Sequence, residues 1–235
     1  MLKALIFDVD GTLAETEDAH RRAFNETFAE ARLNWRWSVA QYRRLLTTTG
    51  GKERMRRHRD ETGATGPDDA TIAALHARKT RRYAEIVAGG GLALRPGVAA
   101  LITRARDAGL RLAVATTTNL PNVDALTLAV WGRPSGAVFD VVAAGDEVER
   151  KKPAPDIYLR ALARLRLRPE DCLAFEDSRN GLIAARAAGI ATAITPSLFT
   201  EGEDFTGADW ILPDLIRLPE GIEARLAGAA RAGAA

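Results

Sequence analysis

The sequence has few of the features expected of an extracellular or membrane-bound protein. It contains one cysteine, Cys172, in 235 residues, so no intramolecular disulfide can form, and a reducing compartment fits this composition. No apolar run approaches the roughly 18 residues of a membrane-spanning helix. The first residues show no signal-peptide pattern. We therefore expect a soluble, cytoplasmic protein that acts without a membrane.

The chain also lacks a strong net charge and is poor in aromatic residues. Its formal net charge is +2 and only 6% of its residues are aromatic, so no global field attracts nucleic acid. A nucleic-acid-binding module needs aromatic side chains clustered with basic ones, and only the segment Trp35 to Trp37 offers that pattern. We therefore expect no nucleic-acid partner. Apolar residues make up 46% of the chain, which is enough for a real core.

A pair of carboxylates follows the first apolar run. The run from Leu2 to Phe7 is interrupted only by Lys3, and Asp8 and Asp10 come directly after it. Such a short apolar run is typical of a strand buried on both faces. The carboxylates then lie at the carboxyl edge of a sheet, where open α/β folds place their chemistry. An ordinary strand followed by an Asp-Gly turn is the alternative interpretation.

The rest of the chain predicts an α/β protein with a helical insertion. Residues 15–91 have helical patterns without a clear strand, and Thr16 has the residue type of a helix N-cap. Residues 92–235 alternate between strand and helix patterns, which predicts a parallel, Rossmann-like sheet covered by helices. We therefore expect a core domain made of residues 1–14 and 92–235, here called the core segment, and an all-helical cap domain of residues 15–91, here called the cap segment.

Three further groups of polar residues stand at predicted strand ends or helix starts. Hydroxyl residues from Thr116 to Thr118 end one apolar run, and Glu176 and Asp177 end another. Lys152 directly precedes Pro153, just before a helix that Pro155 opens, and this position favours Lys152 over the neighbouring Lys151 as a site residue. Because the carboxyl ends of parallel strands meet at one edge, these groups are expected to converge on the two N-terminal carboxylates.

These four motifs, in this order, resemble those of the haloacid dehalogenase superfamily. The resemblance implies that Asp8 attacks phosphorus, that Asp10 acts as the general acid and base, and that Thr116 and Lys152 hold the phosphoryl oxygens and offset their charge. It also implies a Mg²⁺ cofactor, whose preference is for hard oxygen ligands. The implied metal-binding residues are Asp8, Asp10 through its backbone carbonyl, Asp177, and Glu176 either directly or through a water.

The cap segment has its own charge signature. It holds 15 Lys and Arg against 11 Asp and Glu, a net charge of +4 that leaves −2 for the rest of the chain. A basic cap above an acidic, metal-binding core suits a substrate with a second anionic group. Lys52 follows Gly50 and Gly51, so backbone amides and an ammonium group are available to grip a phosphate.

Several stretches narrow the resemblance to the CbbY-type phosphatases, in the β-phosphoglucomutase-like branch. They are Asp-Val-Asp-Gly-Thr-Leu-Ala-Glu-Thr-Glu, Leu-Thr-Thr-Thr-Gly-Gly-Lys-Glu-Arg, and Ala-Gly-Asp-Glu-Val before Lys-Lys-Pro-Ala-Pro-Asp. Enzymes of that type occur with Calvin-cycle genes and remove a phosphate from xylulose-1,5-bisphosphate. The stretch Asn119-Leu120-Pro121 departs from the pattern we would expect. The substrate-binding residues that follow from the motifs and the resemblance are Asp8, Glu17, His20, Gly50, Gly51, Lys52, Glu53, Arg54, His76, Lys79, Thr116, Thr117, Thr118 and Lys152.

The function expected from the sequence is therefore a Mg²⁺-dependent, monomeric phosphatase of a small sugar bisphosphate, with xylulose-1,5-bisphosphate as the favoured substrate. Two alternatives stay open, namely a β-phosphoglucomutase-like phosphomutase and a phosphatase of sugar monophosphates or phosphoglycolate. A metal-free dehalogenase is disfavoured, because that chemistry needs neither Asp10 nor the Glu176-Asp177 pair.

Overall fold

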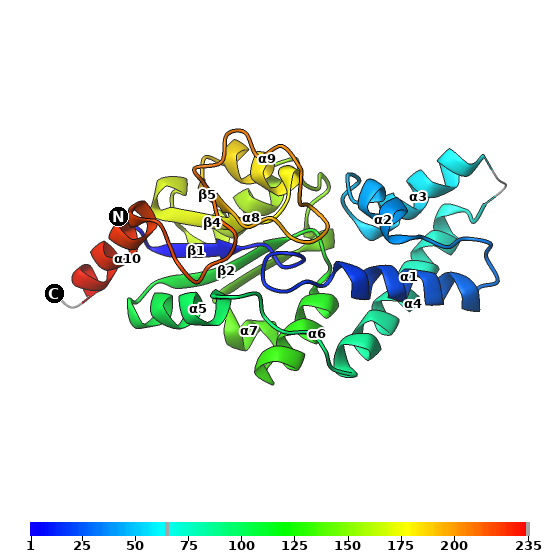
Figure 1. Cartoon of the computed structure of the whole chain (residues 1–235), viewed down its shortest axis with the longest axis horizontal. Helices are drawn as coiled ribbons and strands as arrows, with labels where there is room; N and C mark the ends of the chain where they lie inside the picture. The colour runs from blue at the N-terminus through cyan, green and yellow to red at the C-terminus, as the bar shows by residue number, and fades with distance from the viewer. Residues whose placement is uncertain (64–65, 234–235) are drawn as a thin grey trace.

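A six-stranded parallel sheet forms the centre of the computed structural model, which describes residues 1–63 and 66–233. The strand order is β3-β2-β1-β4-β5-β6, so the chain starts in the middle of the sheet and builds first one side and then the other (Figure 1). This is the expected α/β, Rossmann-like fold. The strands are β1 (Ala4–Phe7), β2 (Arg111–Thr116), β3 (Val141–Ala144), β4 (Cys172–Glu176), β5 (Ala191–Ile194) and β6 (Trp210–Ile211).

Helices cover both faces of the sheet because strand side chains alternate between the two faces. Leu5 and Phe7 pack on the face covered by α5 (Val98–Asp107), α6 (Leu120–Trp131), α7 (Ser135–Val138) and α10 (Glu220–Gly233). Ala4 and Ile6 pack on the opposite face, beneath α8 (Asp156–Leu165) and α9 (Arg179–Ala187). Two short 3₁₀ helices, η1 (Gly145–Glu147) and η2 (Pro169–Asp171), lie between these elements.

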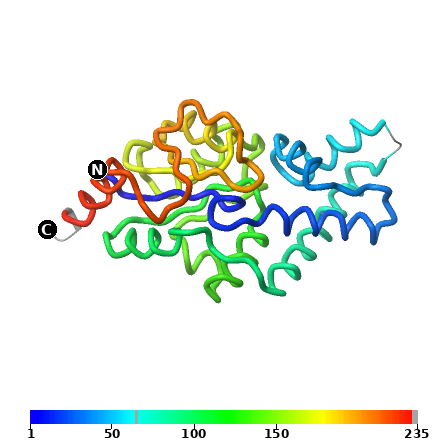
Figure 2. The backbone as a smooth tube through the Cα atoms, viewed as in Figure 1, coloured from blue at the N-terminus to red at the C-terminus, as the bar shows by residue number. Residues whose placement is uncertain are grey.

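The cap segment is helical throughout its described secondary structure. Its helices are α1 (Glu17–Glu30), α2 (Val39–Leu45), α3 (Gly51–Thr62) and α4 (Asp69–Ala88). They enclose an apolar cluster centred on Phe24, Phe28 and Trp37, to which the core segment contributes Phe199, and the backbone trace places them beyond one end of the sheet (Figure 2). A cluster made almost wholly by the cap segment favours an independent unit, although the division into two domains stays a prediction. Residues 64 and 65, in the cap segment, and 234 and 235, at the end of the core segment, lie outside the described residues.

Two local expectations were wrong. Thr16 precedes α1, but its hydroxyl makes no cap bond and instead donates to Asp10 Oδ1 at 2.5 Å. The apolar stretch Val138–Ala144 predicts a strand that starts near Val138, but the strand begins only at Val141, because Val138 belongs to α7. Ser135 starts that short helix, held through its amide and hydroxyl by Asp124 Oδ1 at 2.9 and 2.6 Å. Among the described helices, none combines the length and apolar character needed to cross a membrane.

Candidate active site

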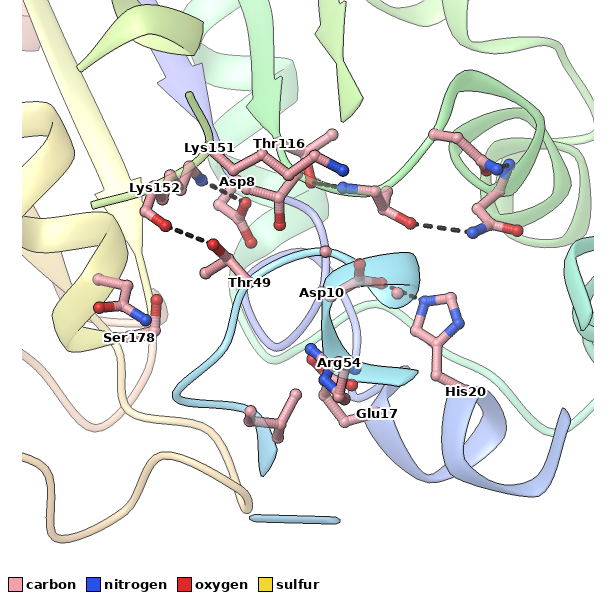
Figure 3. Close-up of a pocket in the computed structure, with 18 of the residues that line it drawn as sticks. Asp8, Asp10, Glu17, His20, Thr49, Arg54, Thr116, Lys151, Lys152 and Ser178 are labelled. Carbon is pink, nitrogen blue, oxygen red and sulfur yellow. Dashed lines mark hydrogen bonds and ion pairs between the residues drawn. The ribbon is translucent and has the colours of Figure 1, made fainter. Parts of the chain in front are cut away.

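The site lies between β1 and β4, where the order in which successive strands are added to the sheet reverses. Phe7 pairs with Phe175 in the parallel register, so the residues that follow both strands emerge side by side. Open α/β sheets bind their ligands at such a reversal of strand order. The cleft here is lined on one side by strand ends of the core segment and on the other by α1, α3 and α4 of the cap segment (Figure 3).

Asp8 and Lys152 form the buried centre of the cleft. Lys152 Nζ donates to Asp8 Oδ1 at 2.6 Å and to the Ala115 carbonyl at 2.8 Å. Burial works against the charge on Lys152, but the carboxylates of Asp8 and Glu176 outweigh it and raise the lysine pKa above its ordinary value. The lysine is therefore a fixed cation, and it points directly at the carboxylate of Asp8.

Glu176 anchors this lysine. Its Oε1 accepts from Lys152 Nζ at 2.5 Å and from the Tyr158 hydroxyl at 2.7 Å. Gly181 makes room for the carboxylate, since a Cβ at that position would lie 1.9 Å from Glu176 Oε2. Glu176 is completely buried and has lost its contacts with water. Its hydrogen bonds with Lys152 and Tyr158 compensate for that loss.

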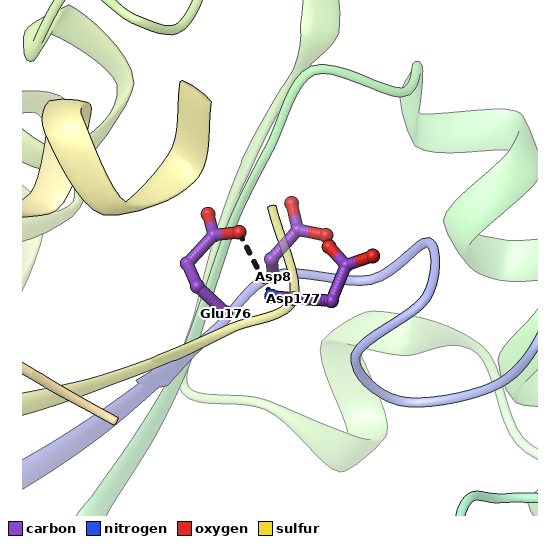
Figure 4. A group of neighbouring side chains, drawn as sticks. All are labelled: Asp8, Glu176 and Asp177. Carbon is purple, nitrogen blue, oxygen red and sulfur yellow. Dashed lines mark hydrogen bonds between the residues drawn. The ribbon is translucent and has the colours of Figure 1, made fainter. Parts of the chain in front are cut away.

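Three carboxylates form the candidate metal centre. Oxygens of Asp8, Glu176 and Asp177 all lie within 4.8 Å of one another, and all three residues are buried (Figure 4). Burial and the neighbouring carboxylates raise the pKa of Asp8 to about 8 and raise that of Asp177 well above its usual range. Buried oxygen ligands whose mutual repulsion one lysine does not neutralise suit a hard divalent cation such as Mg²⁺. Thr200 orients Asp177, with its hydroxyl 3.2 Å from Asp177 Oδ2.

The side chain of Asp10 belongs to a different group. Its Oδ1 accepts from the Thr16 hydroxyl at 2.5 Å and lies 3.0 Å from His20 Nε2. Lys79 Nζ in turn lies 2.6 Å from His20 Nδ1. Burial alone would raise the pKa of Asp10, but His20, Thr16 and Lys79 lower it to about 2. The carboxylate of Asp10 therefore contacts Thr16 and His20 on the side of the cap segment and is not one of the three carboxylates of the acidic group.

His20 and Lys79 are buried supports as well as cleft residues. The His20 ring stacks on Tyr83 with centroids 3.9 Å apart, and Lys79 Nζ lies 4.6 Å from the centre of the Phe24 ring. Burial lowers the pKa of Lys79 to about 7, although Asp10 opposes this effect. Burial, followed by Lys79, also lowers the pKa of His20 to about 4. Both side chains line the cleft, but the direct contact of His20 is with Asp10.

Hydroxyl residues lie at the end of β2, as expected. Thr116 is buried, and its Oγ1 accepts from the Thr118 amide at 3.2 Å. Thr116, Thr117 and Thr118 all line the cleft. The unexpected Asn119 caps α6 by accepting from the Asn122 amide. Its Nδ2 also donates to Thr80 Oγ1 at 3.1 Å, which joins the core segment to α4.

The residues expected from the cap segment divide into two sets. Gly50, Gly51, Arg54, Glu17 and His76 line the cleft. Within this set Tyr42 connects two side chains, because its hydroxyl donates to Glu17 Oε2 and accepts from Arg54, each at 2.8 Å. Burial raises the pKa of Glu17 to about 7.

Lys52 and Glu53 make up the second set, and both pair with the core segment. Lys52 Nζ lies 3.2 Å from Asp146 Oδ2, and Glu53 Oε2 lies 3.4 Å from Lys151 Nζ. The structure therefore brings every motif residue of the core segment together. Two of the expected cap residues, Lys52 and Glu53, are engaged in ion pairs with the core segment.

Several cleft-side residues were not expected from the sequence. They are Thr16, Tyr42, Tyr83, Asn119, Asp146, Tyr158 and Thr200. Tyr158 carried a weak signal, because it lies on the helix that starts just after Lys152 and is the one tyrosine there. Thr16 contacts Asp10 only six positions away. The others have partners distant in the chain, and local patterns contain no information about such partners.

Comparison with known proteins places the chain in a family. A model of haloacid dehalogenase-like hydrolases matches residues 2–189. The protein CbbY of Rhodobacter capsulatus is 64% identical over 214 residues, which is 91% of this chain and 94% of that protein. The crystal structure of CbbY from Rhodobacter sphaeroides with phosphate superposes with a TM-score of 0.89 at 52% identity, covering 93% of this chain and 96% of that one.

A second crystal structure, of a mutant of the Rhodobacter sphaeroides protein, contains xylulose-1,5-bisphosphate and has the same TM-score, identity and coverage. Together these matches confirm the expected α/β fold and the resemblance on which the site residues were chosen. The enzyme class expected from the sequence, a phosphoric monoester hydrolase, is confirmed with them. The chain belongs to the haloacid dehalogenase-like hydrolases, among which its relatives are the CbbY proteins.

Proposed function

We propose that this enzyme hydrolyses xylulose-1,5-bisphosphate to a xylulose monophosphate and phosphate through an aspartyl-phosphate intermediate. The observation that carries the choice of substrate is the complex of that bisphosphate with a protein 52% identical to this chain along nearly its whole length. The net charge of +4 on the cap segment agrees with a substrate that has a second phosphate.

Asp8 is the proposed nucleophile. Its carboxylate attacks phosphorus in line with the departing sugar oxygen, so that a mixed anhydride forms on Asp8 and the sugar alkoxide leaves. Lys152, 2.6 Å from Asp8 Oδ1, offsets the charge that accumulates between the two anionic partners. Thr116 donates its hydroxyl to a phosphoryl oxygen in the same step.

Asp10 is the proposed general acid and base. Its neighbours favour the carboxylate, but the negative charge of a bound phosphoryl group opposes them and raises its pKa, so that it can bind a proton. In that form it gives its proton to the leaving oxygen, and as a carboxylate it then takes a proton from the water that attacks the aspartyl phosphate. Thr16 and His20 hold Asp10 Oδ1 from the side of the cap segment. Closure of the cap segment therefore brings Asp10 into its working position and excludes bulk water.

The residues suited to hold Mg²⁺ are Asp8, Asp177 and the backbone carbonyl of Asp10. Glu176 completes the acidic group, while its Oε1 holds Lys152 and Tyr158. When bound, Mg²⁺ supplies positive charge that neutralises phosphoryl oxygens. Asp8 and Asp177 repel each other within this group, so a cation among them also lowers the pKa of Asp8 and keeps the nucleophile ionised.

Phosphate release from a panel of sugar mono- and bisphosphates, with Mg²⁺ and with EDTA, tests this function. We expect release from xylulose-1,5-bisphosphate to exceed release from the monophosphates and phosphoglycolate by at least about tenfold, to stop in EDTA, and to be lost in Asp8→Asn. Leu198→Ser, a change at an exposed side chain, serves as the control that keeps wild-type rates.

Two outcomes would contradict the proposal. Equal rates on mono- and bisphosphates would keep the catalytic residues but remove the bisphosphate substrate. Conversion of one sugar phosphate isomer to another, on addition of a sugar bisphosphate and without phosphate release, would identify a phosphomutase, in which a sugar hydroxyl replaces water as the acceptor.

A further inference from the structure

Two lysines converge on one carboxylate at the boundary between the cap and core segments. Lys52 Nζ lies 3.2 Å from Asp146 Oδ2, and Lys151 Nζ lies 3.3 Å from Asp146 Oδ1. Lys52 belongs to α3, Asp146 to η1, and Lys151 to the loop before α8. One core carboxylate thus draws together an ammonium group from each segment.

This arrangement borders the cleft of the proposed active site. Asp146 and Lys151 line it together with Gly50 and His76. The Lys151 side chain is only 10% exposed and packs on the loop of Gly50, where an added Cβ would lie 2.9 Å from Lys151 Cδ. Burial, with the charges of Lys79 and Lys52, lowers the pKa of His76 to about 3. Ammonium groups of Lys52 and Lys151 are therefore available at this wall of the cleft, where Asp146 and Glu53 pair with them.

Lys151 and Lys152 are consecutive but serve different places. Lys152 is buried and is committed to Asp8 and Glu176. Lys151 contacts only residues at the boundary, with Glu53 Oε2 at 3.4 Å in addition to Asp146, and Figure 3 shows the two side chains leaving their adjacent backbone positions separately. A substrate with two phosphates needs one cationic site at the nucleophile and a second at a distance from it.

We propose that Lys151 and Lys52 together bind the second anionic group of the substrate, and that Asp146 occupies their ammonium groups until that group displaces it. The inference rests on the proposed function, since it names the part of the cleft that recognises the distal phosphate. The Asp146 side chain is 55% exposed, and ion pairs of that kind contribute little. A phosphate brings more charge and more acceptor oxygens than one carboxylate, so the exchange favours the substrate.

The position of Asp146 gives it a role in selectivity. A monophosphate bound at Asp8 leaves Asp146 paired with both lysines, so it gains nothing from them. A bisphosphate gains both lysines but must displace Asp146. Asp146 therefore weakens the binding of the bisphosphate but not that of a monophosphate. It also screens the two lysines from other anions when no substrate is bound.

Substitution of Asp146 and Lys151 tests the inference. Asp146→Asn should lower KM for xylulose-1,5-bisphosphate about threefold, in line with the loss of two weak ion pairs, and leave KM for xylulose 1-phosphate and xylulose 5-phosphate unchanged. Lys151→Gln should raise KM for the bisphosphate about tenfold with less than a twofold effect on the monophosphates. Lys151→Arg, which keeps the charge, should restore most of the affinity.

Asp69→Asn is the matched control. Asp69 is also an exposed carboxylate that contacts two cations, Arg56 at 3.2 Å and Arg59 at 3.0 Å, but both partners lie within the cap segment. Its loss should leave every KM unchanged. Calorimetric titration of the same variants in an Asp8→Asn background, with the bisphosphate and each monophosphate, measures binding without turnover.

The outcomes separate this inference from the proposed function. If the wild type hydrolyses the bisphosphate but Lys151→Gln affects mono- and bisphosphates equally, the second-phosphate site is wrong and the function stands. If the wild type prefers monophosphates, yet Lys151→Gln selectively weakens bisphosphate binding in the Asp8→Asn background, the site stands and the function is wrong. An Asp146→Asn variant that binds the bisphosphate more weakly than the wild type would overturn the role of Asp146.

Discussion

The positions of single atoms at the acidic group depend on residues that carry no chemistry. Glu176 can occupy its position because Gly181 has no side chain. Asp177 can occupy its position because Gly11 has none either, since a Cβ on Gly11 would lie 2.1 Å from Asp177 Oδ2. Gly11 also has a φ of +81°, a conformation that glycine adopts without strain. The two glycines are therefore part of the carboxylate geometry.

Replacing Gly181 sets two effects against each other. Alanine stabilises a helix by up to about 1 kcal/mol relative to glycine, but a methyl group here would displace the Glu176 carboxylate and with it Lys152. We expect Gly181→Ala to lower kcat at least tenfold without a gain in stability. Gly228→Ala, in α10, where the added Cβ meets no atom within 4 Å from another element of the described residues, should show the helix gain and normal activity. An active, stabilised Gly181→Ala would show that Glu176 tolerates movement.

The Tyr158 hydroxyl offers a second test at this scale. Tyr158→Phe leaves Glu176 Oε1 with Lys152 alone, so we expect a loss of about 1–3 kcal/mol in unfolding free energy and a lower kcat with KM little changed. Tyr83→Phe is the control, because the buried Tyr83 hydroxyl has no partner among the described residues. Urea unfolding and steady-state kinetics measure both variants. Equal stability losses in the two would assign no special role to Tyr158.

At the scale of elements, the cap segment contains all three histidines of the chain, His20 on α1, His58 on α3 and His76 on α4. His58 contacts the edges of Trp35 and Trp37 in the apolar cluster, and burial lowers its pKa, as it does for His76. The helices of the cap segment are therefore assembled around neutral imidazoles.

This arrangement makes the helices of the cap segment sensitive to acid. Between pH 6.5 and a folded-state pKa of about 3 for His76, the unfolded chain binds a proton at this residue that the folded chain does not, so its stabilising contribution falls as the pH falls below 6.5. We expect wild type to lose more unfolding free energy between pH 7.5 and pH 5 than His76→Gln does. The carboxylates have the same pKa shifts in both proteins, so their contribution to the pH dependence of the unfolding free energy cancels in the comparison. Parallel pH profiles would contradict the prediction.

The elements also show how far the sequence could be interpreted. Apolar runs that end in polar residues correctly predicted β1, β2 and β4. The burial of a strand and the position of its end can both be inferred from neighbouring residues in the sequence. The N-cap expectation for Thr16 was wrong because its hydroxyl has a second partner, Asp10, that an isolated helix would not offer. The ion pair of Lys52 with Asp146 joins residues 94 positions apart, and only the folded chain shows it.

At the scale of the whole molecule, the acidic group opposes the stability of the fold. Asp177 lies among like charges with a pKa well above its usual range. In EDTA we expect Asp177→Asn to be more stable than wild type by about 1 kcal/mol, a Tm rise of about 2–4 °C. Mg²⁺ should raise the Tm of wild type, because a ligand of the folded state stabilises it, but should not raise that of the variant. Equal responses to Mg²⁺ would exclude Asp177 as a ligand.

The central position of β1 in the sheet also has a consequence for folding during synthesis on the ribosome. Ala4 pairs with Arg111 on one side and with Cys172 on the other, so the first strand to be synthesised waits for about three quarters of the chain before both of its neighbours exist. Contacts so distant in sequence form late. The nascent chain therefore carries Asp8 and Asp10 before Asp177 exists, and the acidic group stays incomplete until about three quarters of the chain has been made.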